Sequence, residues 1–158
     1  MAVSEDQFRA ALSCFASGVS VVTTKDTAGK FYGITVSAFC WVSLDPPMVL
    51  ICIEKTTASH YAFTESKVFV VNILDKSQEH LSVRFAAPSD DKFEDLEFRQ
   101  GIDGVPALKN ALATLECRLK HKYDGGDHSI FVGEVENTVA GDGAPLIYFR
   151  GQYGAVSD

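Results

Sequence analysis

The chain has 158 residues, of which 46% are hydrophobic and 22% are charged, and its formal net charge is −7. This length and composition predict one soluble globular domain over residues 1–158, with enough apolar residues for a sizeable core. The negative charge argues against a nucleic-acid partner, and no apolar run reaches the ~20 residues of a membrane helix.

Cysteine and histidine usage indicates a reduced compartment and gives no argument for a metal site. The four cysteines, at positions 14, 40, 52 and 117, are scattered and form no C-x-x-C motif. Such thiols behave as small apolar side chains, so we expect a reduced, cytoplasmic chain. The N-terminus shows neither the basic nor the apolar region of a secretory signal. The four histidines lack H-E-x-x-H or any other metal-binding spacing.

The N-terminal half of the chain predicts two helices and several strands. Ser4 and Gln7 form an S-x-x-Q capping box at the start of a helix expected over residues 4–16. Its apolar residues recur at helical spacing on one face, at Phe8, Ala11, Leu12 and Phe15. A short second helix is expected after residue 55. Runs rich in β-branched and apolar residues predict strands over residues 19–25, 31–44, 48–53 and 67–74.

The stretch from residue 33 to residue 54 is the centre of this pattern. Asp45-Pro46-Pro47 fixes a turn between two strands, because proline locks φ and has no backbone donor. Ser37 and Ser43 interrupt the first strand with small hydroxyl side chains, which leave room for a ligand. Small polar groups on a rigid apolar sheet are typical of a small-molecule site. The alternative is a core hairpin in which the serines are merely tolerated.

A polar segment follows this hairpin. Lys55 precedes a short helix for which Thr56 or Thr57 is the expected cap. Backbone amides at such a start, together with Lys55 and the hydroxyls, suit a phosphate group. The alternative is a capped helix after a strand, with no ligand.

The C-terminal half adds one helix, an irregular stretch and three strands. Glycine and proline break any long helix between residues 90 and 110. About six or seven strands lie beside hairpin turns, which favours a barrel or sandwich over a doubly wound α/β fold. The expected helix spans residues 76–87, and the expected strands span 113–123, 128–139 and 145–149.

His128 and Trp41 are ambiguous candidates for function. His128 opens a strand after a Gly-Gly-Asp turn, where it can contact a cofactor or pass a proton, or can be an ordinary surface residue. Trp41 can stack on a planar ligand or cover the core. The sequence contains no nucleophile elbow, no Walker A loop and no Rossmann glycine motif after a strand.

Short motifs in a fixed order cover nearly the whole chain. Through them the chain resembles the short flavin reductase family, whose split-barrel members supply reduced flavin to two-component monooxygenases. The motifs are Phe8-Arg9, Gly18-Val19, residues 21–24, Gly33-x-Thr35-x-Ser37, residues 42–47, residues 69–74, Gln78, Leu81-Ser82, Phe85-Ala86, Asp91-Lys92-Phe93, Leu115-Glu116-Cys117, Gly126-Asp127-His128 and Gly151-Gln152-Tyr153.

This resemblance implies a mainly β, Greek-key split β-barrel with a few short helices, usually assembled as a homodimer. It implies an NAD(P)H:flavin oxidoreductase that uses FMN or FAD with NADH or NADPH and serves a partner monooxygenase. Three positions depart from the family pattern: Ser17 replaces a common Thr, Ala38 replaces Ser or Asn, and Trp41 replaces a small residue. These departures bear on flavin preference and binding mode.

The resemblance also assigns site residues. Residues 33–38 and 52–55 would line the flavin ring through backbone groups, with Lys55 adding charge, and the segment 55–59 would hold the phosphate end. His128 would place the nicotinamide, and NAD(P)H would fold against the flavin itself. The full set is His128 as the catalytic residue, and Gly33, Thr35, Val36, Ser37, Ala38, Ser43, Cys52, Ile53, Glu54, Lys55, Ser59, Phe85, Ala86, His128 and Tyr153 as cofactor-binding residues.

Three other functions stay open at this point. The first is a flavin-binding electron carrier of the same fold that does not turn over NAD(P)H. The second is an oxidase of the pyridoxamine-phosphate type, for which the net charge of −7 and the few arginines are unfavourable. The third is an interaction module without a working site.

Overall fold

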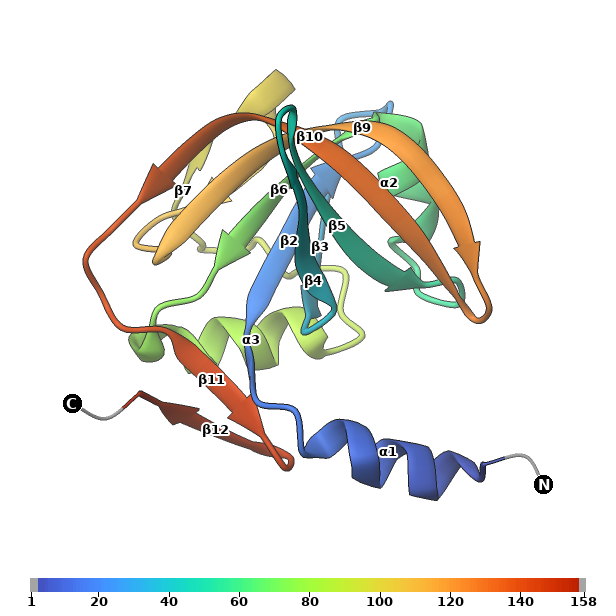
Figure 1. Cartoon of the computed structure of the whole chain (residues 1–158). Coiled ribbons are helices and arrows are strands. Elements are labelled where there is room, and N and C mark those ends of the chain that lie inside the picture. The colour runs from blue at the N-terminus through green and yellow to red at the C-terminus, as the bar shows by residue number, and fades with distance from the viewer. Residues whose placement is uncertain (1–2, 157–158) are drawn as a thin grey trace.

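The structure is a computed structural model that describes residues 3–156. Strands dominate it, as predicted, and most of them belong to one antiparallel sheet of seven strands in the order β3-β2-β6-β9-β10-β5-β4 (Figure 1). Neighbours in this sheet are often distant in sequence. The strands are β2 (Ser20–Lys25), β3 (Phe31–Val36), β4 (Phe39–Leu44), β5 (Pro47–Glu54), β6 (Val68–Ile73), β9 (Ala113–Gly125) and β10 (His128–Ala140).

A short link explains why this sheet curls into a split barrel. β3 and β4 occupy the two opposite edges of the sheet, yet only Ser37 and Ala38 separate them in the chain. A link of two residues spans only about 10 Å, so the sheet must bend until its edges meet there. The single strand predicted over residues 31–44 is therefore wrong at this point, because the chain leaves one edge and joins the other.

Smaller elements flank the barrel. The capping box at Ser4 and Gln7 is confirmed, and the helix α1 (Glu5–Ser13) extends below the barrel in Figure 1. The other helices are α2 (His60–Ser66) and α3 (Glu79–Ala86), which follows the short 3-10 helix η1 (Lys76–Gln78). There are also two small sheets. One contains β1 (Ser17–Gly18), β11 (Leu146–Phe149) and β12 (Gln152–Ala155). The other contains β7 (Phe98–Gln100) and β8 (Pro106–Leu108), which the 3-10 helix η2 (Ile102–Gly104) separates in the chain.

Three apolar clusters hold these elements together, and the smallest packs Val68 and Val70 of β6 against Val105 and Ala107 at β8. The first fills the barrel, where side chains of β2, β5, β6 and β10 surround Phe63 of α2. The second lies under α3, where Leu81 and Phe85 pack against Val19, Val21 and Leu146. The second cluster fixes α3 beside β3, which is the arrangement that forms the pocket described next. No helix within residues 3–156 is long and apolar enough to cross a membrane.

Candidate functional site

A pocket of about 500 Å³ opens between β3, the segment after β5 and the end of α3. Its size suits a small organic ligand. The lining residues are 30–34, 56–59 and 85–90, together with Lys92 and Phe93. Four of the predicted site residues meet here, namely Gly33, Ser59, Phe85 and Ala86.

Gly33 is what allows α3 to lie close to β3. A Cβ atom at this position would fall 2.5 Å from Cε1 of Phe85 and 3.2 Å from Cζ of Phe93. The Phe85 ring is fully buried and meets the Phe93 ring edge-on, with 5.2 Å between the centroids. The absence of a side chain at Gly33 thus gives the pocket an aromatic wall.

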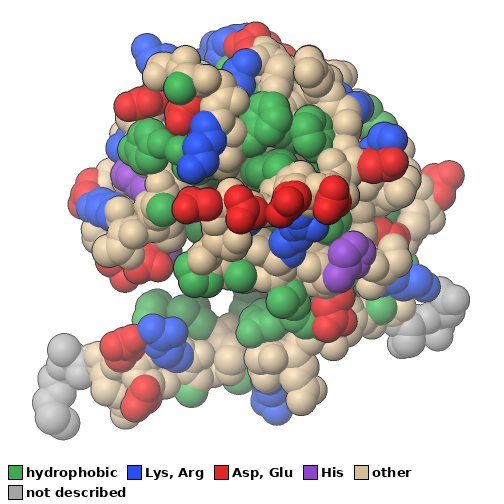
Figure 2. All heavy atoms as spheres, turned by 180° about the vertical axis from the view of Figure 1, so that it is seen from behind, with side chains coloured by type: hydrophobic (Ala, Val, Ile, Leu, Met, Phe, Trp, Pro, Cys, Tyr) green, Lys and Arg blue, Asp and Glu red, His purple; other side chains and the backbone are tan. Residues whose placement is uncertain are grey.

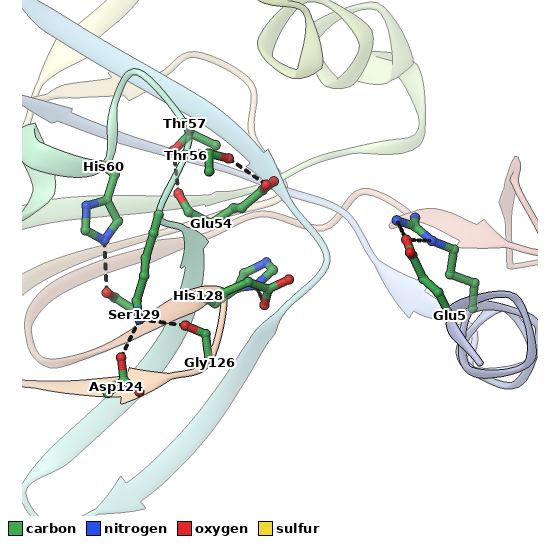
Figure 3. A network of polar contacts seen from close by, with 12 residues as sticks. Glu5, Glu54, Thr56, Thr57, His60, Asp124, Gly126, His128 and Ser129 are labelled. Carbon is green, nitrogen blue, oxygen red and sulfur yellow. Dashed lines mark hydrogen bonds and ion pairs between the residues drawn. The ribbon is translucent and has the colours of Figure 1, made fainter. Parts of the chain in front are cut away.

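The turn after β5 is fixed by Glu54. The Thr56 hydroxyl donates to the Glu54 carboxylate at 2.6 Å, and the Thr57 hydroxyl donates to the Glu54 carbonyl at 2.8 Å (Figure 3). The expected cap by Thr56 or Thr57 is therefore wrong, because both hydroxyls close this turn. Ser59 is the N-cap residue of α2, and its side chain makes no capping hydrogen bond.

Lys55 turns toward the β9–β10 connection. Its ammonium donates to the Asp124 carboxylate and, at 2.6 Å, to the Gly126 carbonyl, while its backbone N–H donates to the Asp127 carbonyl at 2.9 Å. The hydrogen bond from the Lys55 ammonium lowers the pKa of the Asp124 carboxyl group. Lys55 does not line the pocket, so its charge serves the neighbouring turn.

His128 is the first residue of β10 and pairs with Glu54 of β5 (Figure 3). Its Nδ1 lies 2.7 Å from the Asp127 carboxylate, and this hydrogen bond lowers the pKa of Asp127. The ring is 41% exposed and lies beside the turn that follows β5. A half-exposed imidazole that a carboxylate orients can contact a ligand bound at this turn.

Lys92 lines the pocket, although it was not among the predicted site residues. Its ammonium donates to the carbonyls of Gly33, at 3.2 Å, and Phe85, at 2.9 Å. Burial lowers the pKa of Lys92. The motif Asp91-Lys92-Phe93 was part of the family resemblance, but it lies in a charged, irregular stretch whose packing has no sequence signal.

The remaining predicted residues lie outside the pocket lining. Thr35 donates to the Ser82 carbonyl at 2.7 Å, and the Ser82 hydroxyl lies 2.8 Å from the Tyr153 hydroxyl, so these groups connect β3, α3 and β12. Ser43 pairs with Met48, at the end of β5 away from Glu54. Val36 and Ile53 are core residues. Ser37 and Ala38 form the link between β3 and β4. The Cys52 N–H donates to the Ala38 carbonyl at 3.1 Å.

The residues at this site offer no metal-binding cluster. Within residues 3–156, no three His, Cys, Asp or Glu side chains gather in an arrangement that could hold a metal ion. The face seen in Figure 2 carries a row of acidic side chains, which agrees with the net charge of −7. The pocket itself is lined by lysines, hydroxyl groups and aromatic rings, together with the carboxylate of Asp90.

Two bacterial proteins of known function are similar to this chain over most of its length. An FMN reductase (NADH) SmoA of Agrobacterium fabrum is 41% identical over 150 residues, which are 95% of this chain and 85% of that protein. The reductase component of a 4-nitrophenol 4-monooxygenase/4-nitrocatechol 2-monooxygenase of Rhodococcus opacus is 42% identical over 148 residues, 94% of this chain and 79% of that protein.

Solved structures agree with these relatives. The NADH:FAD oxidoreductase SgcE6 of Streptomyces globisporus, in complex with NAD and FAD fragments, superposes with a TM-score of 0.91 at 33% identity and covers 99% of this chain and 97% of that one. The family model described as flavin reductase like domain matches residues 12–157. The chain therefore belongs to the flavin reductase like domain family.

Proposed function

We propose that this chain is an NAD(P)H-dependent flavin reductase that reduces FMN or FAD and supplies the product to a partner monooxygenase. The observation that supports it best is the pocket, because Gly33, Ser59, Phe85 and Ala86 line one cavity. The resemblance assigned these four residues, which come from three separate segments, to one flavin site. The names of the relatives supply NADH, FMN and FAD as the ligands to test first.

The pocket residues fit a flavin. A planar ring needs an apolar wall, which Phe93 provides with the buried Phe85 ring behind it, and an anionic tail needs a cation, which Lys92 provides. When bound, the flavin accepts a hydride from nicotinamide C4, so the cofactors supply the redox chemistry. The chain itself must hold both rings in contact and keep them oriented.

A backbone N–H of β5 can stabilise the negative charge that builds up on the ring. The Cys52 N–H points toward β4, since it donates to Ala38, and the Lys55 N–H points the opposite way, toward Asp127. Because N–H groups alternate along a strand, the Glu54 N–H points to the β4 side, beyond the point where β4 begins at Phe39. A fixed donor at this position stabilises charge without rearrangement. This assigns the task to Glu54 rather than to the Lys55 ammonium.

His128 is proposed to place the nicotinamide. The change His128→Ala is expected to raise the apparent KM for NADH about fivefold, since one lost hydrogen bond costs roughly 1 kcal/mol. FMN affinity should stay unchanged. The measurement is steady-state NADH consumption, with His121→Ala as the control for an exposed histidine on β9. An unchanged KM and hydride-transfer rate in His128→Ala would refute this role.

A homodimer is proposed because α1 leaves an apolar face uncovered. The helix buries none of its residues; Phe8 and Leu12 on it are 57% and 55% exposed, and Phe15, which follows its C-cap, is 78% exposed. In Figure 2, hydrophobic side chains border the hollow between this helix and the barrel. A helix of nine residues is marginal alone, so a second copy packed on it would stabilise it.

The oligomeric state tests this directly. Light scattering on the purified chain should give twice the mass of one chain, and Leu12→Glu should shift the mass toward the monomer. Asp6→Asn, on the same helix, is the control and should leave the dimer intact. A wild-type chain that is monomeric at micromolar concentration would exclude this arrangement.

The proposed activity is tested by NADH consumption with and without added flavin. Turnover that requires and saturates with free FMN or FAD is the expected result, and the ratio of kcat/KM values shows which flavin is preferred. A yellow protein that keeps its flavin but does not oxidise NADH would instead support the electron carrier of the same fold. A chain that binds no flavin would support an interaction module.

A further inference from the structure

The tip of the β9–β10 hairpin, residues 124–127, has little packing to fix its conformation. All four residues are exposed, and Gly126 has a φ of +79°, which few other residues adopt. Asp127 is the last residue of the tip, and its carboxylate orients the ring of His128 through the hydrogen bond of 2.7 Å. The place of the His128 ring therefore depends on what holds the hairpin tip.

Lys55 holds the hairpin tip from outside the hairpin. It directly follows β5, the strand that pairs with β10. Its N–H donates to the Asp127 carbonyl at 2.9 Å, and its ammonium donates to the Gly126 carbonyl at 2.6 Å and to the Asp124 carboxylate (Figure 3). Within residues 3–156, no other residue outside the hairpin forms a hydrogen bond to the tip.

Two of these three contacts come from the ammonium, so they depend on the identity of residue 55. A hydrogen bond from a charged donor is roughly twice as strong as a neutral one. The Asp124 side chain is 79% exposed, so the ion pair contributes less than the bond to the Gly126 carbonyl. The hydrogen bond from His128 lowers the pKa of Asp127 most, and the Lys55 charge lowers it further. Lys55 therefore acts on both the backbone of the tip and the carboxylate that orients His128.

We propose that Lys55 is a positioning residue for the nicotinamide, because its ammonium fixes the hairpin tip and so the place of His128. This rests on the proposed function, since it takes His128 as the residue that contacts the nicotinamide. A histidine on a mobile tip would have to be ordered when the ligand binds, and this ordering lowers affinity. The proposal differs from the expectation that the Lys55 charge acts on the flavin, since Lys55 lies outside the pocket lining.

The first test uses the chain without flavin or nicotinamide. Backbone order parameters at residues 126–128 are measured by NMR relaxation. We expect values near those of a rigid backbone, about 0.85, in the wild-type chain and below about 0.6 in Lys55→Met. Lys55→Arg should recover part of the order, since it keeps the charge. Lys109→Met breaks another exposed ion pair, with Glu97, and should leave the tip unchanged.

The second test measures NADH consumption and FMN binding. In Lys55→Met the apparent KM for NADH should rise about threefold, while kcat and the Kd for FMN should change less than about twofold. Asp124→Asn should raise this KM less, because the bond to the Gly126 carbonyl remains. In the His128→Ala background, Lys55→Met should add no further rise, because the side chain that it positions is gone.

Each outcome decides the proposal. A raised Kd for FMN with an unchanged KM for NADH would overturn it, since Lys55 would then bind the flavin. An additive rise in the double variant, or a tip that stays ordered in Lys55→Met, would also overturn it. If Lys55→Met does not fold, Asp124→Asn replaces it in both tests, with smaller effects in the same directions.

The His128→Ala variant separates this proposal from the proposed function. A raised KM in His128→Ala with no rise in Lys55→Met overturns the positioning role of Lys55 alone. An unchanged KM in His128→Ala means that the proposed role of His128 fails and that the role of Lys55 fails with it.

Discussion

Replacing Gly33 with valine is expected to reduce kcat/KM for flavin by about 10²-fold, because a displacement of about 1 Å at a reacting site has this effect. Even the first carbon of the new side chain would lie 2.5 Å from the Phe85 ring, a distance that forces a shift. Phe85 is fully buried in the cluster under α3, so its ring has no free space to enter. The α3 helix must therefore move away from β3.

This movement would reach the ligand through Lys92. The ammonium of Lys92 connects the Gly33 carbonyl to the Phe85 carbonyl, so separating β3 from α3 breaks at least one of these hydrogen bonds. Overpacking of this kind also costs roughly 1–3 kcal/mol of stability. The measurement is flavin-dependent NADH consumption, with a thermal melt to show that the variant is folded.

Two comparisons make the Gly33 prediction specific. Gly18→Ala is the control, since a Cβ there meets nothing within 4 Å, and it should retain full activity. The double change Gly33→Ala with Phe85→Leu should recover part of the activity lost in Gly33→Ala, because the smaller side chain removes the clash. Full flavin turnover in Gly33→Val would show that the pocket beside β3 is not the site.

Asn72→Ala is expected to lower the free energy of unfolding by about 2–4 kcal/mol, since each buried polar group left unpaired costs roughly 1–3 kcal/mol. Asn72 is fully buried on β6. Its amide nitrogen donates to the Val21 carbonyl of β2 at 2.9 Å, and its amide oxygen accepts from the Leu108 N–H of β8 at 2.8 Å. The alanine variant would leave both partners without these hydrogen bonds.

Urea unfolding measures this loss. Asn137→Ala is the matched control, because this exposed asparagine on β10 makes one side-chain hydrogen bond, to Glu116 at 3.0 Å. Its effect should be smaller than that of Asn72→Ala, because the Glu116 carboxylate keeps its ion pair with Arg99 at 2.7 Å. If Asn72→Ala were no more destabilising than Asn137→Ala, Asn72 would not be the group that attaches β8 to the main sheet.

The long strands could be predicted because their side chains follow a clear pattern. β9 alternates apolar and polar residues, and β10 returns after the turn that Gly126 and Asp127 form. The break between β3 and β4 at Ser37 and Ala38 had no such signal, because the residues on both sides favour strands. The break is imposed by the closure of the barrel, which brings the two edges of the sheet together. β7 and β8 have three residues each, which is too short for any periodicity.

The site was predictable only in part, for a similar reason. Gly33 and Phe85 carried motifs of the family, and the structure brings them together. From the sequence, the hydroxyls of Thr56 and Thr57 were expected to be free to bind a ligand. In the structure both hydroxyls instead donate hydrogen bonds to Glu54. Lys92 approaches the pocket from an irregular segment, and only its contacts with two carbonyls show its position. Local patterns do not contain such tertiary contacts.

The central claim is that this chain transfers a hydride from a nicotinamide to a flavin in the pocket beside β3. The most direct test mixes the purified chain and FMN with NADH in the absence of oxygen and follows the loss of the oxidised flavin absorbance. We expect rapid bleaching that slows when nicotinamide C4 carries deuterium and that is about 10²-fold slower in Gly33→Val at limiting flavin. Bleaching no faster than in a mixture without protein, or unaffected by Gly33→Val, would contradict the claim.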